Sequence, residues 1–278
     1  MKDRCKSMLL LRALLMFNAL TFSAPLFAQP LSVGIVPQQA ASSLARKWGP
    51  LIAHLGEQTG LRLQFATAPS IPEFERRLQQ GQYQVAYMNP YHFTQFSERP
   101  GYVAIAKARN KRIRGLIVVA KDSPLQSLKQ LQNTTLAFPA PNAFAATLLV
   151  QSQLNHLNID FNSKYVSSHD SVYRSVAKGL HPAGGGIQRT LNTLPKRLRT
   201  RLRILWTSAG HTPHAIATHP DLDIEIVTKL QSVLIHLTDS VEGRALLQGL
   251  RIQGFETASQ SDWDDVRALN LNANMARN

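Results

Sequence analysis

The residues with the clearest chemical potential lie in the segment SSHDSVYRSVAKG, residues 167–179, where His169 follows two serines and precedes Asp170. A hydrolytic triad needs serine, histidine and carboxylate in a defined arrangement, and adjacent residues at a strand end point in different directions. The simpler interpretation is that Ser168 or Asp170 caps a helix that carries Tyr173. We therefore do not expect nucleophilic catalysis at this segment.

An oxyanion is the ligand that the residues around His169 suit best. The segment PAPNAFAAT places the start of a second helix at Pro141 to Phe144. The first N–H groups of a helix lack an acceptor within it and carry the positive end of its dipole, so those of Ala143 to Ala145 can bind an anion. His169, at another strand–helix junction, can donate a hydrogen bond to the same anion. A histidine satisfied by local hydrogen bonds is the alternative.

Motifs for other chemistries are missing from the sequence or weak. The patterns GxSxG, HExxH and CxxC do not occur, and neither does a phosphate-binding loop that ends in GK[ST]. The stretch AGGGIQ, residues 183–188, lacks GxGxxG spacing, so its glycines indicate close backbone approach to a ligand or to a packed element. His211, His214 and His219 lack the spacing of zinc ligands, and Pro213 lies among them. We expect a binding protein without catalysis, metal or cofactor.

The N-terminus has the layout of a secretory signal peptide. A basic start is followed by an apolar run over residues 8–22 and by small residues up to Ala28, so we expect cleavage to remove residues 1–28. A membrane anchor is the alternative, but Arg12 interrupts the run, which is shorter than the roughly 20 residues of a span. Cys5, the only cysteine, precedes the run and cannot be a lipid anchor there. We expect a disulfide-free periplasmic protein that is not lipid-anchored.

The charge balance favours anionic partners. The formal net charge is +14, and residues 1–28 hold four basic residues and one acid, so the remainder carries +11. A basic protein attracts nucleic acid, anionic membranes or small oxyanions, and export argues against nucleic acid. The densest basic stretch, residues 196–203, is better explained as a solvated helix end or connection than as an interaction patch.

Strand-like and helix-like segments alternate along the chain, which predicts an α/β fold with mostly parallel sheets. We expect strands at residues 102–108 and 114–121 joined by a turn at 110–112, helices at 123–132 and 141–157, and a weak C-terminal segment. About 250 residues suit two lobes. In such sheets ligands lie at the carboxyl ends of strands, which selects the loops 68–71, 87–91, 140–144, 167–170, 184–189 and 210–214.

Four segments in this order resemble the phosphate/phosphite/phosphonate family of periplasmic solute-binding proteins that serve ATP-binding-cassette (ABC) importers. They are VAYMNPYHF, FPAPNAFAATLL, SSHDSVYRSVAKG and LWTSAGHTPHAIATHP. The resemblance covers nearly the whole chain after residue 28. It implies a two-lobed, hinged periplasmic binding protein fold of type II, with a mixed, mostly parallel sheet in each lobe. The first lobe would comprise residues 29–118 and 213–278, and the second residues 119–212.

The resemblance also implies a set of ligand-binding residues. His169 falls on the ligand-binding histidine of the family. The helix start, the pocket loop of the first lobe and the pocket-facing strand end correspond to Asn142, Ala143 and Phe144, to Ser70, and to Tyr87, Met88 and Asn89. Arg189 and His214 fall where phosphonate binders carry acids.

Two departures from the family pattern bear on the ligand. Ala143, Phe144 and Ala145 stand where phosphonate binders place serine and threonine hydroxyls, and this weakens the expected grip on a phosphonyl group unless backbone N–H groups compensate. Arg189 would repel the ammonium of an aminophosphonate and favour an anion. We therefore do not expect 2-aminoethylphosphonate to be the ligand.

The sequence therefore predicts a soluble periplasmic receptor. It would bind a small oxyanion of the phosphonate, phosphite or phosphate class between two lobes, as a monomer, and deliver it to an inner-membrane ABC permease. The alternative is a ligand-sensing protein of the same fold that feeds a membrane signalling protein. An exported hydrolase that uses His169 and Asp170 is disfavoured because no activated nucleophile is in view.

Overall fold

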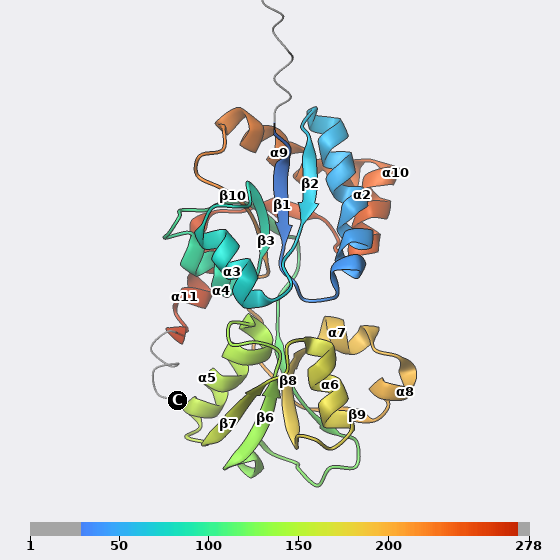
Figure 1. Cartoon of the computed structure of the whole chain (residues 1–278), viewed down its shortest axis with the longest axis vertical. Helices are drawn as coiled ribbons and strands as arrows, with labels where there is room; N and C mark the ends of the chain where they lie inside the picture. The colour runs from blue at the N-terminus through green and yellow to red at the C-terminus, as the bar shows by residue number, and fades with distance from the viewer. Residues whose placement is uncertain (1–28, 272–278) are drawn as a thin grey trace, which may run out of the picture.

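The computed structural model describes residues 29–271, which form two lobes, one above the other in Figure 1. The predicted signal peptide, residues 1–28, lies outside the described residues. The upper lobe is built on a sheet with the strand order β11-β4-β10-β3-β1-β2 and the lower lobe on one with the order β7-β6-β8-β5-β9. The upper strands are β1 (Leu31–Ile35), β2 (Leu63–Ala66), β3 (Val85–Met88), β4 (Val103–Ala108), β10 (Ala215–Thr218) and β11 (Phe255–Thr257). The lower strands are β5 (Gly115–Ala120), β6 (Thr134–Phe138), β7 (Phe161–Tyr165), β8 (Ala183–Ile187) and β9 (Leu202–Thr207).

Each lobe combines a sheet with helices, so the predicted α/β class is confirmed. Both sheets contain parallel and antiparallel strand pairs. In the upper sheet β1 runs parallel to β2 and β3, whereas β10 runs antiparallel to β3 and β4, and β11 antiparallel to β4. In the lower sheet β6 is parallel to β7 and β8, and β5 is antiparallel to β8 and β9. The expectation that parallel pairs would predominate is wrong. Strand–helix alternation produces parallel pairs only while the chain stays in one lobe, and β10 joins the upper sheet directly from the lower lobe.

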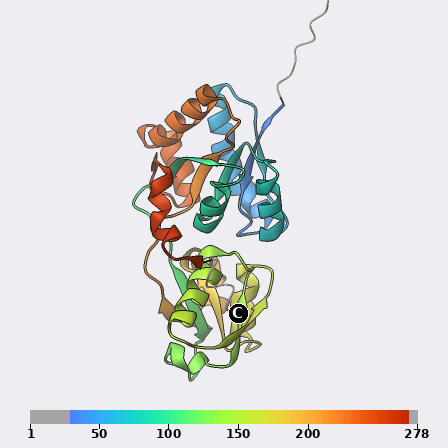
Figure 2. The same ribbon diagram turned by 90° about the vertical axis from the view of Figure 1, so that its left-hand side faces the viewer.

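Helices cover both faces of each sheet (Figures 1 and 2). In the upper lobe α2 (Ala41–Thr59), α9 (Ile224–His236) and α10 (Val241–Leu250) pack together, and α4 (Pro90–Phe96) packs with α3 (Ile71–Gln79) and α11 (Asp264–Arg267). In the lower lobe η2 (Phe144–Leu148) and α5 (Leu149–His156) lie on one face, and α6 (His169–Ala177), α7 (Gln188–Thr193) and α8 (Lys196–Arg199) on the other. Short 3-10 turns occur at Leu128–Leu131, Leu237–Asp239 and Gln260–Trp263.

Three expected elements differ from those observed. The helix expected over 123–132 is only the 3-10 turn at Leu128–Leu131. The helix expected over 141–157 begins later, as a π-helical turn at Phe144 that continues into α5. The C-terminal segment holds β11, a three-residue strand that pairs at the sheet edge. Such a short strand has too little periodicity to be predicted without its partner.

Alternate residues of β5 divide the lower core, because successive side chains of a strand face opposite sides of the sheet. Ile117 and Val119 pack with residues of β6 and α5, whereas Leu116 and Val118 pack with residues of α6 and α7. The upper core extends into the lower lobe at Phe144 and Ala145. The start of the η2 helix is therefore packed between the lobes.

The lobes are joined by two connections, residues 109–114 between β4 and β5 and residues 208–214 between β9 and β10. They run side by side through a β-bridge between Ile113 and His211. The turn expected at 110–112 is instead part of the first connection, because β4 and β5 belong to different sheets. For the same reason the expected lobe limit at residue 118 falls inside β5.

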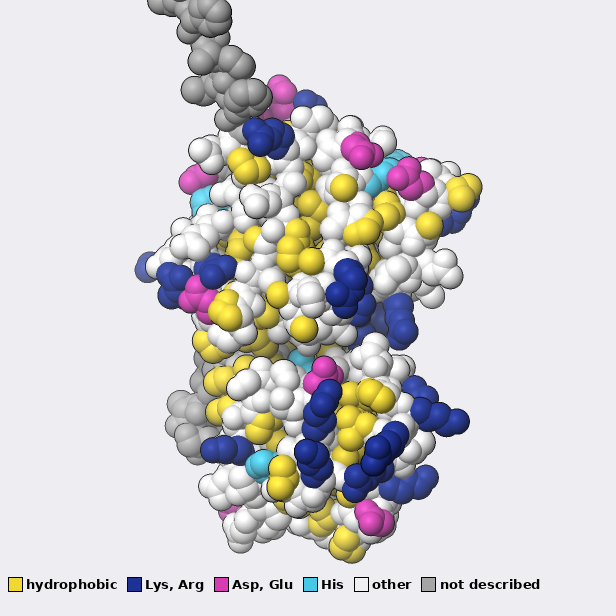
Figure 3. All heavy atoms as spheres, turned by 45° about the vertical axis from the view of Figure 1, so that its right-hand side comes forward, with side chains coloured by type: hydrophobic (Ala, Val, Ile, Leu, Met, Phe, Trp, Pro, Cys, Tyr) yellow, Lys and Arg dark blue, Asp and Glu magenta, His cyan; other side chains and the backbone are white. Residues whose placement is uncertain are grey.

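The surface of the lower lobe carries the basic stretch around α8, within the region where Figure 3 shows many Lys and Arg side chains. Lys196, Arg197, Arg199 and Arg201 are exposed, which agrees with the solvated interpretation. Within residues 29–271, no helix combines the length and the apolar character needed to cross a bilayer.

Candidate ligand-binding cleft

Two neighbouring cavities lie between the lobes. A narrow cavity of about 10 Å³ and a wide cavity of about 260 Å³ share Gln38, Ile113 and Ile187 in their walls. The predicted residues Asn89, Ala143, Phe144 and His169 line the narrow cavity, and the predicted residues Tyr87, Arg189 and His214 line the wide one. The structure thus brings seven of the ten predicted residues to one cleft, but divides them between two compartments.

Glycines allow the helix that lines the narrow cavity to lie directly on the sheet. A Cβ on Gly115 would come within 2.2 Å of the Ala145 carbonyl oxygen, and one on Gly185 within 1.8 Å of that of Ala146. On the other face of β8, a Cβ on Gly186 would lie 2.2 Å from the Tyr173 hydroxyl oxygen. Of the two interpretations of AGGGIQ, the one involving a packed element is confirmed.

The start of the η2 helix presents backbone N–H groups at the narrow cavity. The N–H of Ala143 donates to the Ala140 carbonyl at 3.3 Å, and that of Thr147 donates to the Ala143 carbonyl at 2.7 Å. The N–H groups between them, on Phe144 to Ala146, precede the first intrahelical bonds and carry the positive end of the helix dipole. The donor set is therefore displaced by one residue from the predicted Ala143 to Ala145.

His169 is the first residue of α6 and has 4% of its surface exposed. Ser168 caps this helix by accepting a hydrogen bond from the Ser171 N–H at 3.1 Å, as predicted. The His169 Nδ1 is buried and has no hydrogen-bond partner among the described residues, which argues against local bonds that satisfy the ring. Burial lowers the pKa of His169 to about 4, so the ring is neutral at pH 7 and offers one N–H donor.

Asn89 links the two lobes at the narrow cavity. Its Oδ1 accepts a hydrogen bond from the His92 N–H at 2.8 Å, which caps α4. Its Nδ2 donates to the Asn142 carbonyl oxygen, in the other lobe, at 3.1 Å. Asn142 therefore contributes a backbone contact between the lobes and does not line either cavity. This hydrogen bond would have to break if the lobes separate.

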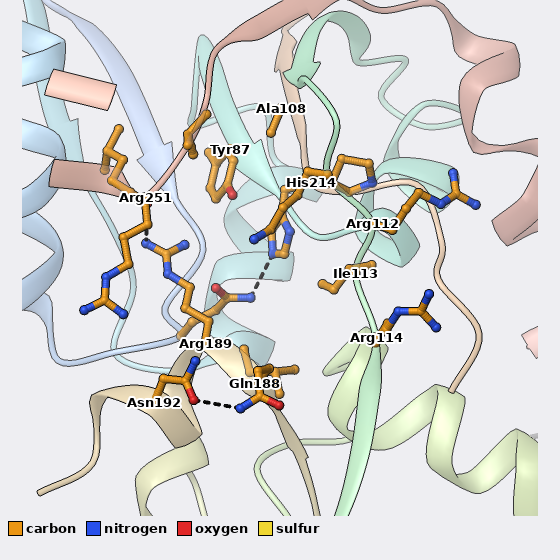
Figure 4. A pocket seen from close by; sticks show the side chains of 16 residues that line it. Tyr87, Ala108, Arg112, Ile113, Arg114, Gln188, Arg189, Asn192, His214 and Arg251 are labelled. Carbon is orange, nitrogen blue, oxygen red and sulfur yellow. Dashed lines mark hydrogen bonds between the residues drawn. The ribbon is translucent and has the colours of Figure 1, made fainter. Parts of the chain in front are cut away.

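Tyr87 and His214 form one wall of the wide cavity (Figure 4). Their rings are stacked with centroids 4.9 Å apart and an interplanar angle of 13°. The His214 Nε2 lies 2.8 Å from the Gln38 Nε2, so that His214 nitrogen accepts the amide hydrogen. Burial, followed by the nearby charge of Arg189, lowers the pKa of His214 to about 3. The ring is thus neutral at pH 7 and adds no charge to the wall.

Arginines dominate the polar lining of the wide cavity. Arg112 and Arg114 are engaged along the interlobe connections, where they donate to the carbonyl oxygens of Gly210 and Ser208, each at 2.8 Å. Arg112 also forms an ion pair with Asp265 at 2.8 Å. Arg189, from the lower lobe, donates to the Leu250 carbonyl oxygen of the upper lobe at 3.4 Å. Carboxylates are missing from the lining residues.

Two predicted residues lie away from both cavities. Ser70 is exposed, and its hydroxyl accepts a hydrogen bond from the Glu73 N–H as the N-cap of α3. Met88 is completely buried in β3, next to Tyr87, and alternation along the strand directs it away from the face that Tyr87 occupies. The prediction that these residues line the pocket rested only on their positions in a loop and at a strand end. Ser70 is instead used as a helix cap, and Met88 faces the opposite side of its strand.

Several residues that line the cavities were not predicted from the sequence. Gln38 lies just beyond the carboxyl end of β1, so the rule that selected the other loops could have found it. Lys111 and Arg114 lie in or beside a segment interpreted as a turn. Arg251 follows α10, and nothing local in the sequence connects it to the cleft.

Metal ligands do not cluster within residues 29–271: in this part of the chain, no three His, Cys, Asp or Glu side chains gather as a metal centre would require. The cleft instead offers N–H donors, guanidinium groups and neutral imidazoles, a set of groups that suits an anion.

Most of the chain, including the residues of the cleft, matches a known family. A model of the family described as ABC transporter, phosphonate, periplasmic substrate-binding protein matches residues 33–263. This chain belongs to that family. The predicted resemblance and the predicted role, a periplasmic substrate-binding component of an ABC transporter, are confirmed. The role that defines the family is substrate binding for transport, and the sensor alternative is not favoured.

Solved structures of similar proteins agree with this binding-protein fold. The binding component of an ABC phosphonate transporter from Pseudomonas aeruginosa has a TM-score of 0.79 and 18% identity over 87% of this chain and 86% of that one. PhnD1 from Prochlorococcus marinus, in complex with methylphosphonate, has a TM-score of 0.80 and 18% identity over 88% of this chain and 98% of that one. A Xanthomonas citri protein bound to ATP has a TM-score of 0.71 and 19% identity over 89% of this chain and 97% of that one. At these identities the likeness establishes the fold, which is the one predicted.

Proposed function

We propose that this binding protein holds the head group of a phosphonate-class oxyanion, meaning a phosphonate, phosphite or phosphate, in the narrow cavity. The observation that carries the proposal is the buried, unpartnered Nδ1 of His169 beside the start of the η2 helix. A buried polar atom without a partner is costly unless a ligand satisfies it. The N–H groups of Phe144 to Ala146 would complete the donor set.

An anion fits this cavity because its polarity comes from fixed dipoles. The helix N-terminus carries a partial positive charge, and the neutral imidazole of His169 can turn its N–H toward an oxyanion without adding a charge of its own. Backbone N–H groups would therefore compensate in part for the absence of hydroxyl side chains at Ala143, Phe144 and Ala145. The grip would be weaker than one with charged or hydroxyl donors.

The ligand would reach the narrow cavity only when the lobes part. A cavity of about 10 Å³ holds roughly one water molecule, so a phosphonyl group does not fit there as the lobes stand. Opening would break the bond between Asn89 and Asn142 and bend the paired connections at Ile113 and His211. We infer hinged lobes with limits at these connections, between residues 108 and 115 and between residues 207 and 215.

The remaining features agree with a role in transport. We propose that residues 1–28 are cleaved, that the protein is free in the periplasm without a lipid anchor, that it acts as a monomer, and that it does not catalyse a reaction. An inner-membrane permease would receive the ligand. The methylphosphonate bound to the Prochlorococcus marinus protein and the ATP bound to the Xanthomonas citri protein support an oxyanion as the head group here.

A thermal-shift series tests the proposal. The purified protein is freed of ligand by partial denaturation and dialysis, then mixed with phosphate, phosphite or methylphosphonate, each against chloride at matched ionic strength. Binding at about 100 times the Kd stabilises by roughly 2.7 kcal/mol, which corresponds to a rise of roughly 5–10 °C in Tm. If none of the three raises Tm above the chloride control, the proposal is wrong.

A further inference from the structure

Two arginines, one from each lobe, lie at one end of the wide cavity without a counter-charge. Arg189 comes from α7 of the lower lobe, and Arg251 comes from the end of α10 in the upper lobe. Figure 4 shows their guanidinium groups side by side at one end of the cavity, whereas Arg112 and Arg114 lie at the other end and point away from it. Neither Arg189 nor Arg251 forms an ion pair with a described residue.

Further positive charge surrounds this pair. Lys47 on α2 has its pKa lowered by burial and then by the charges of Arg189, Arg251 and Arg46. Its ammonium donates to the Gln39 Oε1 at 2.6 Å, which is a neutral partner. Ion pairs to Arg46 and Lys47 are likewise missing among the described residues. Figure 3 shows basic side chains on both sides of the boundary between the lobes.

Like charges held close on opposite walls of a cleft oppose its closure. Two such charges repel each other, and the repulsion is stronger in a partly desolvated cleft than in water. A negatively charged group between them reverses the sign of the interaction and stabilises the closed arrangement. A ligand with an ammonium in this position would add to the repulsion.

We propose that the ligand of this protein carries two anionic groups, a phosphonate head in the narrow cavity and a carboxylate or second phosphoryl group between Arg189 and Arg251 in the wide cavity. This inference rests on the proposed function. The two cavities share the walls formed by Gln38, Ile113 and Ile187, so they adjoin, and parting of the lobes would let a single small molecule span both. The stacked rings of Tyr87 and His214 provide a neutral wall for the chain that joins the two groups.

Guanidinium chemistry suits this second group. A planar guanidinium binds carboxylate or phosphate oxygens through paired N–H donors, and charge-assisted bonds of this kind are stronger than neutral ones. The Asn192 side chain, which accepts from Gln188 Nε2 at 2.7 Å, also lines the wide cavity and offers a further amide N–H. The wide cavity can therefore distinguish phosphonates by the charge of the group at their far end.

Calorimetric titration of the ligand-free protein with three matched phosphonates tests the inference. Methylphosphonate has only the head group, phosphonoacetate adds a carboxylate, and 2-aminoethylphosphonate adds an ammonium. We expect phosphonoacetate to bind at least about tenfold more tightly than methylphosphonate, and the aminophosphonate to bind more weakly than both.

Variants then locate the effect. Arg189→Gln and Arg251→Gln should each reduce the ratio of phosphonoacetate to methylphosphonate affinity several-fold, and together bring it close to one. Arg201→Gln removes the same charge from an exposed site on the lower lobe and should leave the ratio unchanged. An equal loss in Arg201→Gln would mean that net charge explains the preference, and the inference would be overturned.

The titrations separate the two proposals. If methylphosphonate binds and phosphonoacetate binds no more tightly, the second anionic group is disproved while the proposed function stands. If phosphate, phosphite and all three phosphonates fail to bind, both are disproved. Preference for phosphonoacetate that survives in the double arginine variant also overturns the inference.

Discussion

The two cavities of the cleft differ in size and in the groups that line them. The narrow cavity of about 10 Å³ is lined by a neutral histidine and backbone N–H groups, whereas the wide cavity of about 260 Å³ has cations among its lining residues. A hydrogen bond needs its donor and acceptor atoms within about 3.2 Å, whereas the field of the cations reaches about 8 Å in physiological salt. The contrast indicates that the narrow cavity selects the geometry of a head group and the wide cavity selects the charge of the group attached to it.

The narrow cavity depends on backbone contact, and Gly185→Ala should disrupt it with the largest effect. A Cβ there would lie 1.8 Å from the Ala146 carbonyl oxygen, so the η2 helix must shift from the sheet. We expect a loss of about 3 kcal/mol in the free energy of unfolding, measured with urea, together with weaker anion binding. Gly249→Ala, in a helix with no atom within 4 Å of the new Cβ, should instead stabilise by about 0.5–1 kcal/mol. Equal effects of the two changes would contradict this account of the glycines.

His169→Ala removes the side-chain donor of the narrow cavity. We expect the affinity for methylphosphonate to fall by about 100-fold, because a hydrogen bond to a charged oxygen is lost in a buried site. The ligand-free Tm should hardly change, since His169 Nδ1 has no partner to lose. His156→Ala, at an exposed position at the far end of the same lobe's α5 helix, serves as control. A His169→Ala protein that melts much lower and still binds would show that the histidine is structural.

Acid should lower the free energy of unfolding of the ligand-free protein, because a buried histidine lines each cavity. Burial lowers the pKa of His169 to about 4 and that of His214 to about 3, from an ordinary value of 6.5. Below pH 6.5 the unfolded chain therefore binds more protons than the folded protein. The stability is fully present above that pH and is lost as the pH falls toward the pKa values of the two folded-state histidines. We expect a decrease of about 3 kcal/mol in the free energy of unfolding between pH 7.5 and 5.5. His169→Ala should remove about half of this dependence, and an unchanged slope would exclude His169 as its source.

The smallest expected effect separates binding from stability in the wide cavity. Arg251 has φ of 57° at the end of α10, a left-handed conformation that glycine adopts more easily. Arg251→Gly should therefore raise the free energy of unfolding by about 0.5–1 kcal/mol while it reduces the preference for phosphonoacetate. Arg244→Gly, inside the same helix, should lose about 1 kcal/mol and keep the preference. A destabilised Arg251→Gly protein would contradict the assigned strain.

Local features of the fold and the cleft could be predicted because they depend on neighbours in sequence. Ser168 was expected as a helix cap and is one, since a hydroxyl three residues before an N–H reaches it in any such helix. Gly185 was expected at a close approach, which is a consequence of the missing side chain. In contrast, Ser70 lies outside both cavities because its hydroxyl caps α3, and Met88 because it faces the other side of β3.

The pairing of distant segments could not be predicted in this way. The expected excess of parallel strands is wrong because β10 comes from the other lobe, and the expected turn at 110–112 is an interlobe connection. Arg251 and Gln38 reach the cleft only because α10 and β1 end at the same side of the upper lobe.

Sequence alone was enough to indicate the class of protein, through the resemblance of four segments to a known family, the helix start at His169 and the excess of positive charge. The helix at Phe144 begins later than the sequence predicted. The charge follows from composition, and the helix start at His169 follows from a cap, which acts over a few residues. The three-dimensional structure was needed to show that Arg189 and Arg251 lie side by side and that the Nδ1 of His169 is buried without a partner. Burial and charge proximity depend on which surfaces come together, and the packing of the whole chain decides that.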